Sequence, residues 1–225
     1  MTSATVETRR TRVARFTASE RAIHWIVATA FFSLLGSGLL MGHRGSFHNV
    51  MYALHLTSAG ILVLGVAVVV FRGNRRALSR TARQLRTIDD LDRAWLRGVP
   101  AAVLRHRAQP PAGRFNAGQK VNVILISLLL AALFVSGIGL VVSIPAASPV
   151  FKAAHVAAAY LSIVPIVGHL YMALVNPGTR PALRGMISGR VDRAWLLKHH
   201  PGAVKTCWPP DPAALRTRAA RWVLS

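Results

Sequence analysis

The sequence predicts an all-α membrane protein, a four-transmembrane-helix bundle with both termini in the cytoplasm. Three observations lead to this prediction: an apolar composition, four apolar runs, and an uneven distribution of basic residues. Of the 225 residues, 52% are hydrophobic and the mean hydropathy is +0.40, which is high for a soluble domain. The runs cover residues 22–42, 51–71, 121–143 and 152–175, each close to the roughly 20 residues that a helix needs to cross the hydrocarbon layer.

Basic residues concentrate in three segments that the runs separate. Of the 28 Lys and Arg residues, five precede the first run, twelve lie in residues 72–120 and nine follow residue 175, while the two short connections contain one each. Basic residues are retained on the cytoplasmic side of a membrane. We therefore expect both termini and the long middle loop in the cytoplasm, where they also favour contact with anionic membrane lipids.

The predicted elements follow in order along the chain. A basic cytoplasmic arm, residues 1–21, precedes a transmembrane domain over residues 22–175, in which a basic loop over 72–120 separates two helical hairpins. The first run ends in LLMGHRG, which lacks the cleavage site of a signal peptide, so this helix is expected to stay in the membrane. Within the loop, DDLDRAWLRGVPAAVL predicts a short amphipathic helix. Residues 176–225 form a basic tail, and no internal repeat is evident.

Composition also excludes several classes of function. A net charge of +21 would suggest nucleic acid binding in a soluble protein, but membrane topology explains its distribution, and no nucleic acid partner is expected. Cys207 is the only cysteine, which excludes disulfides within the chain and iron–sulfur clusters bound by its own cysteines. Any iron–sulfur chemistry must therefore belong to a partner protein.

Four histidines lie within or at the edge of the runs, where ionisable side chains are costly and commonly functional. The predicted topology places His24 and His169 toward the cytoplasmic side, and His55 and His155 toward the outer side. His155 and His169 are fourteen residues apart, which at about 100° per residue puts them on one helix face at two depths. Two pairs on different helices predict two bis-histidine haem b sites stacked across the membrane.

Each of these features also has a simpler interpretation. An intramembrane histidine can be a hydrogen-bonded packing residue, and glycines in the runs can serve helix packing as readily as the approach of a flat macrocycle. A non-haem metal site is disfavoured, because each level offers two histidines and no carboxylate. The remaining histidines lie in loops or the tail and are expected on the solvated surface: His43, His48, His106, His199 and His200.

The histidine-bearing segments resemble the cytochrome b (gamma) subunit of membrane-bound respiratory formate dehydrogenases. The resemblance covers roughly residues 15–202. NAGQK and the GMISG to KHHP segment are its specific parts, whereas histidine-bearing helices alone also fit cytochrome b subunits of hydrogenases. The similar elements are RFTASERAIHW, ALHLTSAG, GRFNAGQK, AAHVAAAYLSIVPIVGHLYMALV and RGMISGRVDRAWLLKHHPG.

The resemblance implies a set of binding residues. FNAGQK would contribute to a quinone pocket beside the cytoplasmic-side haem, with Asn116, Gln119 and His169 as quinone-binding residues. Side-chain amides can hydrogen-bond a quinone carbonyl, although the same segment also fits an ordinary helix start with Asn116 as N-cap. Two haem b groups are implied, with axial ligands in the pairs already described: His24 with His169 on the cytoplasmic side, and His55 with His155 on the outer side.

The family also implies a function. The chain would be the quinone-reducing electron-transfer subunit of its complex, passing electrons from an outer-face iron–sulfur beta subunit to menaquinone or ubiquinone near the cytoplasmic face. A molybdopterin alpha subunit would oxidise formate, because this chain has no site for it. The expected location is the cytoplasmic (inner) membrane of a prokaryote, and the state of any higher oligomer is left open.

Two alternatives remain at this point. The donor could be a hydrogenase or another molybdenum oxidoreductase instead of a formate dehydrogenase. The chain could also be a haem-free membrane anchor or transporter whose histidines relay protons or hold helices together. The short connection MGHRGSFHN and the tail beyond His200 depart from the family pattern, so no role transfers to that tail or to Cys207.

Overall fold

The computed structural model describes residues 12–42, 45–105, 109–142 and 145–203. It contains four long apolar helices, each long enough to cross a membrane, and this confirms the predicted helical membrane protein with four spans. Every helix begins four or five residues before its apolar run, because a polar first turn precedes the membrane segment. The helices are α1 (Ala18–Leu40), α2 (Ser46–Arg72), α5 (Ala117–Val142) and α6 (Ser148–Leu170), the last continued by a π-helical turn, η1 (Tyr171–Val175).

Local sequence sets where these helices begin. At α1, the Thr17 side chain accepts a hydrogen bond from the backbone N–H of Glu20, and the Glu20 carboxylate accepts one from the N–H of Thr17. This reciprocal arrangement satisfies two amide groups that would otherwise lack partners. At α2, Gly45 precedes the helix with a φ of 82°, a conformation that glycine adopts without a steric penalty.

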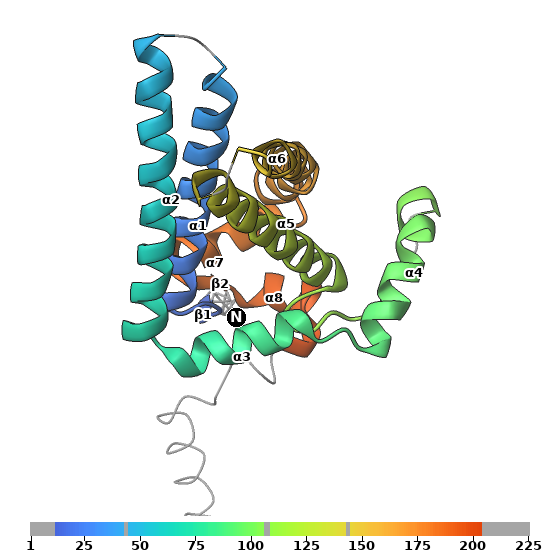
Figure 1. The fold of residues 1–225 in the computed structure, drawn as a ribbon. Coiled ribbons are helices and arrows are strands. Elements are labelled where there is room, and N and C mark those ends of the chain that lie inside the picture. Colours follow the sequence, from blue (N-terminus) through green and yellow to red (C-terminus); the bar gives the residue numbers. More distant parts are fainter. Residues whose placement is uncertain (1–11, 43–44, 106–108, 143–144, 204–225) are drawn as a thin grey trace, which may run out of the picture.

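The long helices pair as two hairpins, α1 with α2 and α5 with α6, which are inclined to one another (Figure 1). Close packing holds each hairpin: a Cβ at Gly65 would lie 3.1 Å from Ile26, and one at Gly139 would clash with the ring of Phe151. These two glycines therefore serve helix packing.

Between the hairpins, the chain forms two helices at one end of the molecule, α3 (Arg75–Arg86) and α4 (Asp90–Arg105). The predicted helix at 89–104 is thus present as α4, whereas α3 lies in a segment expected to be loop. Asn74 caps α3 by accepting a hydrogen bond from the N–H of Ala77. The sequence of α3, RRALSRTARQLR, is amphipathic. At helical spacing, Leu78, Thr81 and Leu85 share one face, and the five arginines lie away from that face.

The arm and the tail meet at this same end. Strand β1 (Arg12–Ala14) pairs antiparallel with β2 (Arg190–Asp192). This two-stranded sheet is a small departure from the all-α fold that the sequence predicts. A small core forms around Val191, Leu196 and Ala203, with Val13 and Trp195 against it. The remaining elements of the tail are η2 (Arg180–Ala182), α7 (Leu183–Ser188), α8 (Arg193–His199) and η3 (Pro201–Ala203).

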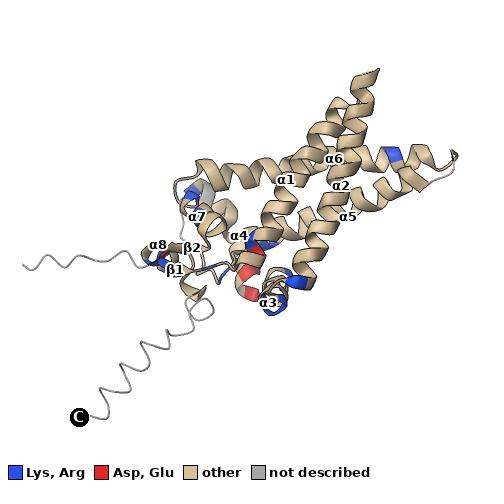
Figure 2. Ribbon diagram, turned by 90° about the vertical axis from the view of Figure 1, so that its left-hand side faces the viewer, with Lys and Arg blue, Asp and Glu red and all other residues tan. Residues whose placement is uncertain are grey.

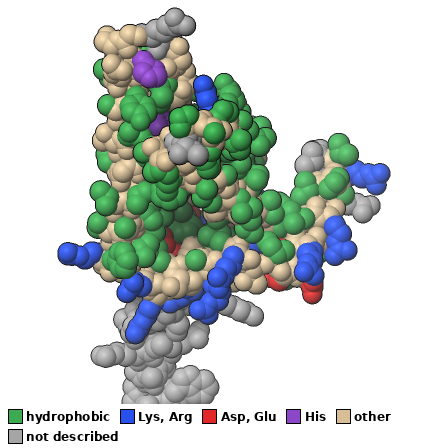
Figure 3. All heavy atoms as spheres, viewed as in Figure 1, with side chains coloured by type: hydrophobic (Ala, Val, Ile, Leu, Met, Phe, Trp, Pro, Cys, Tyr) green, Lys and Arg blue, Asp and Glu red, His purple; other side chains and the backbone are tan. Residues whose placement is uncertain are grey.

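Charge and apolar surface divide the molecule into two parts. We call the end that carries β1, β2, α3, α4, α7 and α8 the basic end. The opposite end, where α1 and α5 end and α2 and α6 begin, is the loop end. Apart from Lys152, the described Lys and Arg residues gather at the basic end (Figure 2). Hydrophobic side chains cover the long helices (Figure 3), and only 6–17% of the residues in their most apolar windows are buried against protein. The protein is therefore an integral membrane protein, and the apolar surface of its long helices suits a lipid environment.

Candidate functional site

Two pairs of histidines face each other across the hairpins. His24 on α1 and His169 on α6 have ring centroids 6.1 Å apart, with 61° between the ring planes. His55 on α2 and His155 on α6 also have centroids 6.1 Å apart, with 64° between the planes. The structure thus brings together the same two pairs that the predicted topology placed at equal depths.

The spacing of each pair fits one haem iron. At metal–nitrogen distances of about 2 Å, and with each nitrogen about 1 Å from its ring centre, two imidazoles on opposite sides of one iron have centroids roughly 6 Å apart. Among the described residues, no group of three His, Cys, Asp or Glu side chains is close enough to hold a metal ion. Gly36 and Gly60 would accept a Cβ without meeting any atom within 4 Å, which leaves space beside α1 and α2. The donor set and its spacing therefore suit haem b.

The two pairs lie at different levels. His24 is in the second turn of α1 and His169 near the end of α6, so this pair is toward the basic end. His55 and His155 lie in the third and second turns of their helices, toward the loop end. Pro165 sits one turn before His169 and cannot donate a helical hydrogen bond, and the π-helical turn follows directly, closed by Asn176 N–H to the Tyr171 carbonyl at 3.0 Å. Irregular helix of this kind is frequent at functional sites.

Two serines that the sequence interpretation missed contact the loop-end pair. Ser37 Oγ lies 3.0 Å from His55 Nδ1, and Ser136 Oγ lies 3.0 Å from His155 Nδ1. Both serines are almost fully buried, at 2% and 4% exposure. A Ser–Gly dipeptide 18 residues before His55 and 19 before His155 is the signal that could have revealed them.

The predicted quinone residues begin α5 at the basic end. Asn116 Oδ1 accepts a hydrogen bond from Gln119 N–H at 2.8 Å, and Gln119 Oε1 accepts one from Asn116 N–H at 3.0 Å. The helix-start interpretation of Asn116 is therefore confirmed. Both amide oxygens are used in this cap, whereas the two NH2 groups make no hydrogen bond to any described residue. The cap thus leaves two neutral donors for a ligand.

Helix α4 borders this helix start. A Cβ at Gly118 would lie 3.1 Å from the indole ring of Trp95, so the ring covers the turn between Asn116 and Gln119. The Lys120 ammonium makes a buried ion pair with Asp92 and donates to the Thr87 carbonyl at 3.1 Å. Although burial by itself raises the pKa of Asp92, the Asp89 N–H and the Lys120 ammonium bond to its carboxylate and hold the pKa below the usual value.

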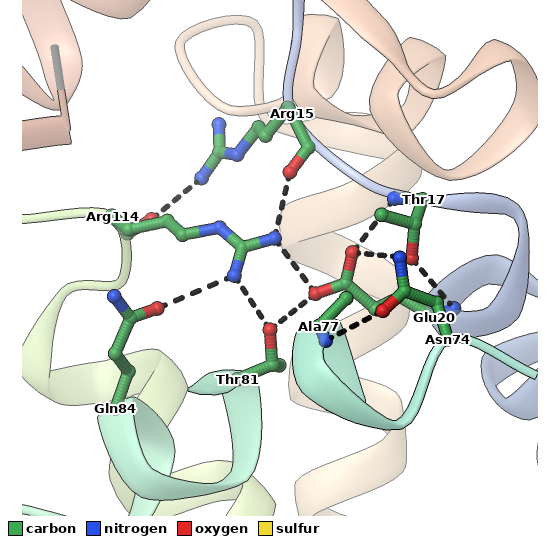
Figure 4. Close-up of polar contacts among 8 residues, drawn as sticks. All are labelled: Arg15, Thr17, Glu20, Asn74, Ala77, Thr81, Gln84 and Arg114. Carbon is green, nitrogen blue, oxygen red and sulfur yellow. Dashed lines mark hydrogen bonds and ion pairs between the residues drawn. The ribbon is translucent and has the colours of Figure 1, made fainter. Parts of the chain in front are cut away.

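A buried polar cluster joins α1, α3 and the segment before α5 (Figure 4). The Glu20 carboxylate accepts hydrogen bonds from the Thr17 N–H, from the Thr81 hydroxyl and from Arg114 Nη2, the last at 2.8 Å. Arg114 Nη2 also donates to the Arg15 carbonyl at 2.7 Å. The side chains of Glu20 and Arg114 are 5% and 9% exposed. The cluster therefore fixes the start of α5 relative to the turn of α1 that precedes His24.

His200 lies in the interior, contrary to the surface position expected for it. Its Nδ1 donates to the Gly113 carbonyl at 2.9 Å, and its Nε2 accepts from Arg15 Nη2 at 3.2 Å. Burial and the Arg15 charge lower the pKa of His200 to about 4. His199 stacks on Trp195, while His43, His106 and Cys207 lie outside the described residues.

Two facing histidine pairs between membrane-spanning hairpins fit a membrane-bound cytochrome b, and residues 15–189 match the family described as prokaryotic cytochrome b561. The chain is 32% identical to the formate dehydrogenase cytochrome b556(fdo) subunit of Escherichia coli K12, over 86% of this chain and 92% of that protein. It is 28% identical to the cytochrome b556(Fdn) subunit of the nitrate-inducible formate dehydrogenase of Escherichia coli K12, over 81% and 85%. It is also 28% identical to the formate dehydrogenase cytochrome b556 subunit of Haemophilus influenzae, over 85% and 82%. The chain therefore belongs to the prokaryotic cytochrome b561 family, among the cytochrome b subunits of formate dehydrogenases, and the predicted resemblance is confirmed.

Proposed function

We propose that this protein is a di-haem membrane subunit that transfers electrons from an iron–sulfur subunit of a formate dehydrogenase complex to membrane quinone. The proposal rests on the two facing histidine pairs. In each pair the two histidines come from different hairpins, and their ring centroids are 6.1 Å apart. The relatives, which are named as cytochrome b556 subunits of formate dehydrogenases, support the same function.

Each of the four histidines would contribute one imidazole nitrogen to a haem iron. His24 with His169 would hold one haem b at the basic end, and His55 with His155 would hold the other at the loop end. When bound, haem b supplies reversible one-electron chemistry.

Quinone reduction would take place at the basic end. The NH2 groups of Asn116 and Gln119 would donate hydrogen bonds to a quinone carbonyl, beside the Trp95 ring and on the level of His169. Reduction of a quinone to a quinol consumes two electrons and two protons. A site at the edge of the membrane lets water supply these protons, while the electrons arrive through the membrane domain.

The distribution of basic residues supports a side of the membrane for each partner. The positive-inside rule would place the basic end in the cytoplasm, so the iron–sulfur subunit would dock at the loop end, with the molybdopterin subunit beyond it. Electrons would then move inward across the membrane, toward the side from which quinone takes protons. The reaction would separate charge across the cytoplasmic membrane of the cell.

Haem content and reducibility of the purified complex test this function. We expect two haem b groups per chain, both reduced when formate is added and both reoxidised by a quinone. A colourless protein, after expression with a haem supply, would instead indicate a haem-free anchor or transporter. Reduction of the haems by hydrogen but not by formate would indicate that the chain is a subunit of a hydrogenase complex.

A further inference from the structure

The two hairpins repeat one arrangement around the loop-end histidines. Ser37 on α1 contacts His55 on α2, and Ser136 on α5 contacts His155 on α6, each through an Oγ to Nδ1 distance of 3.0 Å. The glycine that follows each serine packs against the same ring: a Cβ at Gly38 would lie 3.5 Å from the His55 Cε1 atom. A Cβ at Gly137 would lie 3.4 Å from the Cε1 of His155.

The direction of these hydrogen bonds follows from the neighbouring carbonyls. A serine hydroxyl has one hydrogen. Ser37 Oγ lies 2.7 Å from the Ser33 carbonyl oxygen, and Ser136 Oγ lies 2.6 Å from that of Ala132. A carbonyl oxygen can only accept, so each hydroxyl hydrogen points toward its own helix backbone.

Each serine oxygen is consequently the acceptor of the bond to histidine. Nδ1 of His55 and of His155 must carry the ring hydrogen, and Nε2 of each keeps its lone pair for a metal. A ring N–H that donates to an oxygen makes the opposite nitrogen a stronger electron donor. Among the described residues, no hydrogen bond of this kind reaches the ring nitrogens of His24 or His169.

We propose that Ser37 and Ser136 are positioning residues that fix the metal-binding tautomer of His55 and His155 and lower the reduction potential of the loop-end haem below that of the basic-end haem. This inference rests on the proposed function, since it requires haem at both histidine pairs. A stronger donor stabilises the ferric state over the ferrous state, which lowers the potential. An electron donor at the loop end and a quinone at the basic end would then be linked by sites of rising potential.

Redox titration of the purified full complex tests the proposal. The two potentials are assigned to sites by His55→Ala, which should retain only the basic-end component. We expect Ser37→Ala and Ser136→Ala each to shift the loop-end potential upward, the double variant to shift it further, and the basic-end potential to stay unchanged. Ser37→Thr and Ser136→Thr should restore the wild-type potential, because a threonine hydroxyl can make the same two bonds.

Ser162→Ala is the matched control. Ser162 is a buried serine of α6, at 1% exposure, whose hydroxyl donates to the Ala159 carbonyl at 2.6 Å. We expect both potentials to be unchanged in this variant. If the alanine variants lose haem, Ser37→Cys and Ser136→Cys carry the same expectation of an upward shift, because a thiol is a weaker acceptor.

The outcomes separate this inference from the function on which it rests. Two haems whose potentials do not move in any serine variant would overturn the role of Ser37 and Ser136 and leave the di-haem function intact. A wild-type loop-end potential above the basic-end potential would overturn the proposed order. Absence of reducible haem from the wild-type complex would overturn the function itself.

Discussion

Asn116 and Gln119 cap each other at the start of α5, each side-chain oxygen accepting a hydrogen bond from the other residue's backbone N–H. The two amide groups are thereby oriented, with their oxygens toward the helix and their NH2 groups unused by the described residues. One pair of residues thus combines a structural role with a proposed quinone-binding role. The two roles use different atoms of the same amide, so substitutions can separate them.

We predict that Asn116→Ser and Asn116→Ala both weaken binding of a quinone analogue. Each loses the NH2 donor, and a lost hydrogen bond to a neutral group costs about 0.5–1.5 kcal/mol, or roughly two- to tenfold in affinity. Serine still serves as an N-cap, so only alanine should also destabilise α5. Titration with a quinone-site inhibitor measures the affinity, and haem spectra should stay unchanged. Normal affinity in both variants, with lower stability in Asn116→Ala alone, would leave the residue a cap and nothing more.

Ligand pairing predicts which variants share a spectrum. His24→Ala and His169→Ala should each remove the basic-end haem, and His55→Ala and His155→Ala should each remove the loop-end haem, because each proposed site would then keep one imidazole instead of two. Low-temperature absorption spectra of the four variants, with haem content per chain, provide the measurement. His169→Ala should also abolish quinone reduction.

The control for these variants is His48→Ala, which removes a histidine of α2 whose Nδ1 bonds the Met41 carbonyl at 2.8 Å. Both haems should remain in it. Loss of different spectral components from His24→Ala and His169→Ala would contradict the pairing.

Pattern and topology explain why much of this site was predictable. A run of about 20 apolar residues indicates a transmembrane helix. The side of the membrane on which each helix begins then sets the depth of its histidines, which are His24, His55, His155 and His169. Depth alone then pairs them. The resemblance added Asn116 and Gln119, and the helix start with Asn116 as N-cap was one of the two interpretations that the sequence allowed.

What escaped prediction depends on contacts between distant segments. Strands of three residues, such as those that pair Val13 with Val191, carry no periodic signal. The sequence places His200 in the tail and predicts an exposed position, because its contacts with Arg15 and Gly113 join segments that are distant in the chain. Ser37 and Ser136 look like small packing residues of an apolar helix, because their role is visible only when the facing ring is placed.

We predict that Glu20→Ala strongly destabilises the protein. Removal of the carboxylate leaves the Arg114 guanidinium buried without its counter-charge, and breaking a buried pair in this way costs about 3–5 kcal/mol. The melting temperature of the complex in detergent should fall by several degrees, with loss of the basic-end haem on heating. Asp90→Asn provides the comparison, since Asp90 pairs with Arg93 on the exposed face of α4, where an ion pair contributes about 1 kcal/mol or less. Equal losses in the two variants would show that the cluster does not support α1.

Acid should loosen the tail at His200. The pKa of His200 is lowered from 6.5 to about 4 by burial and by the Arg15 charge, so the ring is neutral when the tail is docked and charged more readily when it is released. The docked state is therefore fully favoured above about pH 6.5, and this contribution is lost as the pH falls toward about 4. The shift corresponds to roughly 3 kcal/mol. We predict that hydrogen exchange of residues 190–203 rises over this pH range more than the intrinsic exchange rates require.

His200→Gln separates titration of the ring from its packing. Glutamine can donate to the Gly113 carbonyl through its NH2 group and accept from Arg15 through its oxygen, but it does not ionise. Exchange of residues 190–203 in this variant should match the wild type above about pH 6.5 and stay protected as the pH falls to about 4. At any given pH, the wild type and this variant have nearly the same intrinsic exchange rates. The difference in exchange between the two proteins therefore reports the ionisation of His200. An identical acid response in both would mean that another group, and not His200, releases the tail.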